Sequence, residues 1–217
     1  KPFPEVRRAH RMTDEGYIKF ESRWRPSGPV RDPVVDELIR WRRPLYGAGL
    51  VGVYKDIGIG YGNLSARVEP PGLFVITGSG TGRIEEAGPE HFALVTGCDI
   101  DANVIESTGA AEASSESMTH AAIYELDERF RAVVHVHSMS LWKGLRDSVP
   151  ATRGDVAYGT PQMAREFRRL YSETGFRDEG IAVMAGHEEG LVSVGTSVRE
   201  AAERMLAVRE KFLRSAP

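Results

Sequence analysis

Apolar residues recur along this chain with two periods, and the two periods predict a mixture of helices and short strands. Spacings of three and four residues, which are typical of one helix face, occur at residues 33–44, 114–129, 160–170 and 197–212. Short apolar runs between turn residues predict strands at 50–54, 64–68, 73–77, 92–96, 104–107, 132–137, 181–185 and 191–194. No internal repeat or low-complexity segment interrupts this pattern.

The order of these elements indicates a fold class. The predicted helices and strands are mixed along the chain, and tight turns connect several adjacent strands. This order predicts an α/β sandwich whose sheet is largely antiparallel. Asp32-Pro33 begins the first helix with a capping residue and a proline, and Ser197 with Glu200 forms a capping box for the last one. We predict a polar N-terminal extension or arm over residues 1–30 and a single domain over residues 31–217.

Composition and charge exclude several classes of protein. The chain has 217 residues, of which 41% are hydrophobic and 27% charged, and its net charge is −3. These values fit an ordinary globular domain and give no reason to expect a nucleic-acid or membrane partner. The basic residues of the extension, Arg7, Arg8, His10 and Arg11, are interrupted by acidic ones and predict a solvated arm; contact with nucleic acid is the less favoured alternative.

Cysteine content and hydropathy indicate the compartment. Cys98 is the one cysteine of the sequence and cannot form an internal disulfide, which favours a reducing environment. No apolar run of the sequence approaches the roughly 20 residues that a membrane-spanning helix needs. We therefore expect a cytoplasmic protein.

Two histidines close the strand predicted at 132–137. In His135-Val136-His137 the imidazoles stand two residues apart, so on a strand they point to the same face. Two converging neutral imidazoles are half of a zinc site, and zinc suits such nitrogen ligands. The plain alternative is that histidines at a strand end are simply hydrogen-bonded.

A catalytic zinc site takes a third protein ligand and leaves a fourth position open. His187 is the strongest candidate, because it follows the apolar run 181–186 and would meet the pair if the two strands lie close in the sheet. A polar residue at a turn is its plain alternative. His10 in the extension and His91 at a strand start are weaker candidates, and His120 falls inside a predicted helix, where packing or hydrogen bonding is expected.

Three segments could bind an anion. Gly60-Tyr61-Gly62-Asn63 and Thr77-Gly78-Ser79-Gly80 are turns of little bulk, where backbone amides could approach a ligand closely. Ser114-Ser115 stands where a helix is predicted to begin, and the free amides there attract phosphate. Each segment also has a plain interpretation, because glycine turns often only turn the chain and Ser114 is a good N-cap.

Glu116 follows these serines in the first turn of the predicted helix. A carboxylate at this position most often interacts with the helix dipole. If Ser114 and Ser115 hold a substrate phosphate, however, Glu116 lies beside the substrate. Near a zinc ion it could then act as a general acid and base.

Taken in order, these segments resemble the class II aldolase/adducin family. The resemblance is carried by Gly-Asn63-Leu-Ser-Ala-Arg, Thr77-Gly-Ser-Gly80, Ser114-Ser-Glu116, His135-Val-His137-Ser138 and Gly186-His187. Their order is that of the L-fuculose-phosphate aldolases, and the likeness runs from about Asp36 to the end of the sequence. It implies a cytosolic, zinc-dependent enzyme with a three-layer α/β/α fold over residues 31–217. It also implies a homotetramer with sites at the subunit interfaces.

Carried over residue by residue, the resemblance implies three sets of roles. The metal ligands for Zn²⁺ would be His135, His137 and His187. The phosphate of dihydroxyacetone phosphate or of a ketose phosphate would be held by Asn63, Ser79, Gly80, Ser114 and Ser115. The catalytic acid and base would be Glu116. The implied partner is thus a small-molecule sugar phosphate.

The implied reaction is the cleavage or formation of a C–C bond in a ketose phosphate. Zinc would supply Lewis acidity that favours an enediolate of the dihydroxyacetone-phosphate type. Glu116 removes or returns the proton at carbon, and we expect burial to raise the pKa of its carboxyl group.

Other members of the family leave alternatives open. The same zinc site serves a methylthioribulose-phosphate dehydratase, pentulose-phosphate epimerases and decarboxylases of aromatic hydroxy acids, while adducin uses the fold without chemistry. A decarboxylase would need a site for a carboxylate, which Arg83 or Arg153 could supply. The turn at residues 77–80 lacks the proline usual in the family. The segment between His137 and Thr160 is shorter than in the fuculose-phosphate aldolases, so no tyrosine is assigned near the aldehyde.

Overall fold

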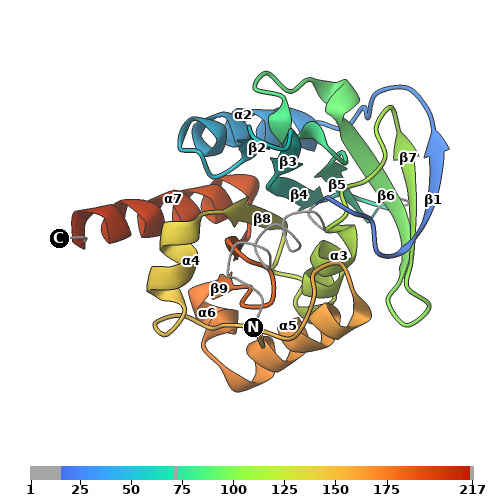
Figure 1. Cartoon of the computed structure of the whole chain (residues 1–217). Helices are drawn as coiled ribbons and strands as arrows, with labels where there is room; N and C mark the ends of the chain where they lie inside the picture. Colours follow the sequence, from blue (N-terminus) through green and yellow to red (C-terminus); the bar gives the residue numbers. More distant parts are fainter. Residues whose placement is uncertain (1–15, 71–72, 216–217) are drawn as a thin grey trace.

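The computed structural model describes residues 16–70 and 73–215, and an eight-stranded sheet crosses this part of the chain (Figure 1). Its strand order is β1-β7-β6-β5-β4-β8-β10-β9. The strands are β1 (Glu21–Pro26), β4 (Asn63–Arg67), β5 (Phe74–Thr77), β6 (Phe92–Asp99), β7 (Val104–Gly109), β8 (Ala132–His137), β9 (Ile181–Val183) and β10 (Gly190–Gly195). Among these strands β1 and β7 pair in parallel, and the other neighbours pair antiparallel. The prediction of a largely antiparallel sheet is confirmed.

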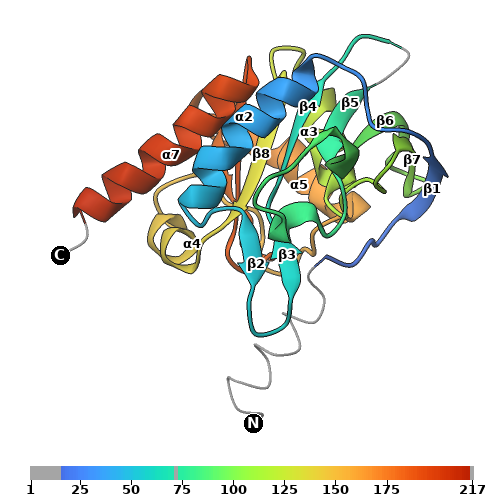
Figure 2. The same ribbon diagram turned by 90° about the horizontal axis from the view of Figure 1, so that it is seen from above.

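Helices cover both faces of the sheet and make the fold three-layered, as expected. One face carries α2 (Val34–Gly47), α4 (Met139–Leu145) and α7 (Val198–Ser215), and the other carries α3 (Ser117–Leu126), α5 (Pro161–Glu173) and α6 (Phe176–Glu179). Figure 2 shows α2 and α7 side by side in front of the sheet, with α3 and α5 behind it. Each face therefore buries its own apolar core.

Alternation along the central strands decides which residues face which layer. Val133 packs in the core under α3 and α5, whereas Val134 and Val136 pack in the core under α2 and α7. The period of two therefore directs His135 and His137 toward the layer of α3. In the same way Leu64 and Ala66 face α2 and α7, and this leaves Asn63 and Ser65 on the α3 side.

Several elements were not predicted from the sequence. Strand β1 belongs to the extension assigned to residues 1–30, and its polar sequence fits an edge strand that is largely exposed. The basic residues Arg7, Arg8, His10 and Arg11 lie outside the described residues. Strand β3 (Ile59–Tyr61), helix α4 and the four-residue helix α6 are also additional to the prediction.

Helix α3 begins later than expected, at Ser117 rather than Ser114, and ends at Leu126. Ser114 makes a tight turn before it, since its Oγ accepts a hydrogen bond from the Glu116 amide at 3.3 Å. The other predicted starts are closer: Thr160 caps α5, and Ser197 Oγ accepts from the Glu200 amide at 3.1 Å before α7. Among the described residues, none of the helices combines the length and the apolar character that crossing a bilayer requires.

A small hairpin packs beside the end of the sheet and approaches the site described below. It consists of β2 (Gly52–Tyr54) and β3, and it rests on the short 3₁₀ helix η1 (Thr81–Arg83). A Cβ atom added at Gly82 would lie 2.7 Å from both the backbone N and O of Tyr61. Such a distance is too short for any side chain, so this close contact requires glycine.

We predict that Gly82→Ala destabilises the protein and that Gly47→Ala does not. The first change forces the hairpin away from η1 and should lower the free energy of unfolding by about 1–3 kcal/mol, the usual cost of overpacking. Gly47 ends α2, and an added Cβ there meets nothing within 4 Å. Alanine should stabilise that position by up to about 1 kcal/mol. Urea unfolding of both variants tests this, and equal stabilities would contradict it.

Candidate metal centre

Three buried imidazoles meet at one end of the sheet. His135 and His137 end β8, and His187 lies in the turn that connects β9 to β10. The antiparallel pairing of β10 with β8 sets Gly190 opposite His137, and this brings the turn beside the histidine pair. One nitrogen atom from each ring lies within 4.8 Å of the other two. The convergence that the sequence analysis required of His187 is therefore present.

Hydrogen bonds orient two of these rings. His135 Nδ1 lies 3.1 Å from the carbonyl oxygen of Leu191, and since a carbonyl only accepts, Nδ1 carries the proton. His137 Nδ1 lies 2.8 Å from the Tyr54 hydroxyl. The two Nε2 atoms face each other at 3.0 Å. Two nitrogen ligands of a tetrahedral zinc ion would stand roughly 3.3 Å apart, so this spacing fits a shared metal.

Tyrosine rings stack on two of the three imidazoles. Tyr61 stacks on His137 with centroids 5.5 Å apart, and Tyr158 stacks on His187 at 4.4 Å. His135, His137 and His187 are each no more than 4% exposed. The imidazoles are thus shielded from bulk water and restricted in rotation.

Glu116 faces the imidazoles from the residue just before α3. Its Oε1 lies 3.2 Å from His187 Nδ1 and 4.0 Å from His135 Nε2, and the residue is 2% exposed. Within the described part of the chain no hydrogen bond of full geometry satisfies either carboxylate oxygen, although His187 and Thr119 lie close enough to lower the pKa of the group. A buried carboxylate without such bonds is costly unless a positive charge compensates it. The arrangement has the charge and the donor atoms that a divalent cation needs.

The expected direction of the pKa shift of Glu116 is wrong. Burial does raise the pKa of this carboxyl group, but the charges of His135 and His187 act in the opposite direction and lower it to about 2. Glu116 is therefore ionised at neutral pH. It is available to accept a proton.

His120 keeps the structural role expected of it. Its Nδ1 lies 2.7 Å from Ser65 Oγ, which in turn lies 2.7 Å from the Tyr124 hydroxyl. Burial, with a further contribution from His135, lowers the pKa of His120 to about 3, so the ring stays neutral. His91 accepts a hydrogen bond from the Gly88 amide and is not part of the cluster.

Asn63 lies directly beside the histidine cluster. It stands opposite His135 in the pairing of β4 with β8, and both side chains point toward the α3 layer. Its Oδ1 is buried and has no hydrogen-bond partner among the described residues. A polar atom in this condition is available to a ligand.

The two other predicted anion-binding segments meet beside Asn63. Gly78 forms a bridge with Ala113, and the Ser79 amide donates to the Glu112 carbonyl oxygen at 2.8 Å. These bonds bring the turn with Ser79 and Gly80 next to Ser114 and Ser115. The Ser79 amide is already occupied, so its hydroxyl, rather than its N–H, is the group that remains for a ligand.

Gly60 and Gly62 serve close packing of the chain rather than anion binding. A Cβ at Gly60 would lie 3.0 Å from the Arg83 amide nitrogen, and one at Gly62 would lie 2.9 Å from the Val51 side chain. These residues allow the hairpin to pack closely on its neighbours. Gly190, which the sequence analysis did not select, matters more: a Cβ there would lie 3.0 Å from the His187 carbonyl oxygen and 3.2 Å from ring atoms of both His135 and His187.

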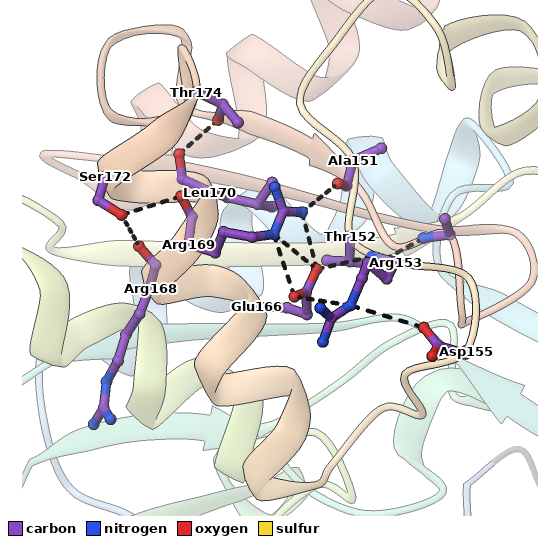
Figure 3. A network of polar contacts seen from close by, with 11 residues as sticks. Ala151, Thr152, Arg153, Asp155, Glu166, Arg168, Arg169, Leu170, Ser172 and Thr174 are labelled. Carbon is purple, nitrogen blue, oxygen red and sulfur yellow. Dashed lines mark hydrogen bonds and ion pairs between the residues drawn. The ribbon is translucent and has the colours of Figure 1, made fainter.

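An ionic network surrounds the buried carboxylate of Glu166 (Figure 3) and lies next to the turn that carries His187. Glu166 Oε2 accepts hydrogen bonds from the Arg153 amide and from Arg169 Nη2, both at 2.9 Å. The segment that these bonds anchor packs on the turn, because the Ala185 amide donates to Thr152 Oγ1 at 3.0 Å. Arg153 also pairs with Glu166 and Asp155 through its side chain, so it is engaged in this network.

The residues that the sequence analysis missed come mainly from the hairpin and the turn. The Tyr54 hydroxyl lies 2.8 Å from both His137 Nδ1 and Glu189 Oε2. Glu189 has a φ of 69°, a left-handed conformation that costs a residue other than glycine roughly 1–3 kcal/mol. This strained residue two positions after His187 could have been suspected only from the fold.

Solved structures with a similar fold include two aldolases. L-fuculose-1-phosphate aldolase from Thermus thermophilus superposes with a TM-score of 0.62 at 22% identity, covering 84% of this chain and 92% of that chain. A sugar-phosphate aldolase from Thermotoga maritima gives 0.64 at 16% identity, covering 83% and 94%. YgbL from Escherichia coli, a candidate aldolase, epimerase or decarboxylase, gives 0.62 at 20% identity, covering 83% and 86%. These likenesses support the fold.

The sequence itself matches a family model over most of the domain. Residues 57–212 match the class II aldolase and adducin N-terminal domain. This stretch contains the three imidazoles, Glu116 and the turns beside them. The chain belongs to the class II aldolase and adducin family.

Proposed function

We propose that the protein is a zinc-dependent aldolase, a lyase that cleaves or forms a C–C bond in a ketose phosphate. The observation that carries this proposal is the buried Glu116 carboxylate facing the cluster of His135, His137 and His187. An ionised base beside a site suited to a divalent cation is what proton transfer at a carbon next to a carbonyl requires.

His135, His137 and His187 would hold the metal. Their all-nitrogen donor set favours zinc over magnesium or calcium, which prefer oxygen ligands. When bound, zinc would supply Lewis acidity toward the carbonyl and hydroxyl oxygens of the substrate. The protein's own contribution begins with the fixed orientation of His135, whose Nδ1 proton is held by the Leu191 carbonyl.

Glu116 would move the proton. Its position between the imidazoles and the two serines sets its carboxylate beside the substrate carbon. Its carboxylate would remove a proton in one direction of the reaction and return that proton in the other. The enclosure of the site restricts access of water to the reacting carbon.

The phosphate would lie at the start of α3. Ser114 and Ser115 precede this ten-residue helix, whose dipole attracts an anion, although the Glu116 and Ser117 amides already donate to Ser114. The Ser79 hydroxyl, the exposed backbone of Gly80 and the amide of Asn63 would complete the cradle, since they gather at the same end of the sheet. A sugar phosphate is therefore the substrate class that we propose.

The family likeness also supports a homotetramer with sites between subunits, and a cytoplasmic enzyme. Of the other reactions on such a site, a decarboxylase would need a free cation for its carboxylate. Of the two arginines considered for this task, Arg153 pairs with Glu166 and Asp155 through a largely exposed side chain, and Arg83 lies exposed on η1. An aldolase remains the function that the geometry supports best.

Removal of one histidine ligand should weaken zinc binding strongly. We expect His137→Ala to weaken zinc affinity by at least about 10–100-fold, the loss that follows even when only an outer partner of a ligand is removed. His91→Ala, which changes a histidine outside the cluster, should bind as tightly as the unmodified protein. Metal content and chelator competition measure both, and full zinc binding by His137→Ala would refute the ligand assignment.

Glu116→Gln should separate chemistry from metal binding. The zinc-loaded variant should lose about 10²–10⁴-fold in kcat, because the amide cannot accept the proton. Glu125→Gln, on the outer side of α3, should retain full activity. The assay presents a panel of ketose phosphates and measures dihydroxyacetone phosphate and aldehyde. If the zinc-loaded protein cleaves none of them, aldolase is wrong, and dehydratase or decarboxylase takes its place.

A further inference from the structure

We propose that Tyr54 and Glu189 are positioning residues that set the tautomer and orientation of His137. The inference rests on the proposed metal centre and assigns to it a support that comes from the β2–β3 hairpin. Neither residue would touch the metal. Both would act through the ring of His137.

The hydrogen-bond chemistry of the three groups determines the direction of each bond. The Tyr54 hydroxyl lies 2.8 Å from Glu189 Oε2 and 2.8 Å from His137 Nδ1. A phenol has one proton, and an ionised carboxylate can only accept, so Tyr54 donates to Glu189. The remaining bond therefore runs from the His137 Nδ1–H to the Tyr54 oxygen. This leaves His137 Nε2 without a proton.

That unprotonated nitrogen is the one aimed into the cluster. His137 Nε2 lies 3.0 Å from His135 Nε2, at the point where the metal would bind. His135 obtains the same tautomer from the backbone, through the Leu191 carbonyl. The Nδ1 atom of His137 is bonded instead to a side chain, so its tautomer can be altered by a substitution outside the eight-stranded sheet. An outer partner of this kind fixes a ligand ring and raises its basicity.

The backbone holds Glu189 in place for this task. Its carbonyl oxygen accepts a hydrogen bond from the Ser138 amide at 2.9 Å, which ties the β9–β10 turn to the end of β8. Its φ of 69° is a left-handed conformation that glycine normally occupies, yet a carboxylate stands here. The backbone conformation at this position favours glycine, yet the sequence has a glutamate there. The bond to Tyr54 gives a reason.

The chain offers a matched control in Tyr61. This residue lies on the same hairpin, 4.6 Å from the Tyr54 ring, and stacks on His137. Its hydroxyl, however, donates to the Gly49 carbonyl oxygen at 3.3 Å. Tyr54→Phe and Tyr61→Phe each remove one hydroxyl from the hairpin, but only the first removes a bond to His137.

The test is zinc affinity, measured by competition with a chelator. Tyr54→Phe should bind zinc about 10–100-fold more weakly than the unmodified protein, whereas Tyr61→Phe should not differ. Glu189→Gln should give a smaller loss, because an amide oxygen is a weaker acceptor than a carboxylate. The double variant should be no weaker than Tyr54→Phe alone, since Glu189 acts through Tyr54.

A second readout does not depend on the metal. In the metal-free protein ¹⁵N NMR of His137 should show a protonated Nδ1, and Tyr54→Phe should show a mixture of both tautomers. Equal zinc affinity of Tyr54→Phe and Tyr61→Phe would overturn this inference but leave the proposed metal centre standing. An unmodified protein that binds no zinc would overturn the metal centre and this inference with it. Should Tyr54→Phe fail to fold, unchanged affinity in Glu189→Gln overturns the inference.

Discussion

An ionised carboxylate that is withdrawn from water must find its compensation inside the protein, and here Glu116 faces the rings of His135 and His187. Desolvation favours the neutral acid, whereas the imidazoles favour the carboxylate, and the second influence is the larger. The site is stable only if positive charge lies among these groups. A divalent cation held by three imidazoles meets that requirement better than protonated rings crowded against one another.

The rest of the fold arranges this meeting. β8 runs through the middle of the sheet between β4 and β10, so its last residues have a neighbour on each side. β4 supplies Asn63, the β9–β10 turn supplies His187, and the α3 layer supplies Glu116. The β2–β3 hairpin then places the rings of Tyr54 and Tyr61 against His137. The site is therefore built from segments that are distant in sequence, and a shift of register in any one pair would disperse it.

Local periodicity explains which parts could be predicted. The common face of His135 and His137 follows from the period of a strand, and the starts of α5 and α7 follow from their caps. The prediction that His187 joins the histidine pair could only be conditional, because it depends on the register between β8 and β10. The β2–β3 hairpin was not predicted, because Gly60 and Gly62 suggested an anion-binding loop, whereas they allow close packing. The pKa of Glu116 was predicted in the wrong direction because burial acts locally, whereas the opposing charges come from two other elements.

The metal centre can be located in a crystal of the zinc-loaded protein by anomalous scattering at the zinc edge. We expect one strong peak about 2.0–2.1 Å from a nitrogen of each of His135, His137 and His187. The carboxylate of Glu116 should lie next to it. A protein that takes up no zinc, or a peak bound by other residues, would contradict the central claim.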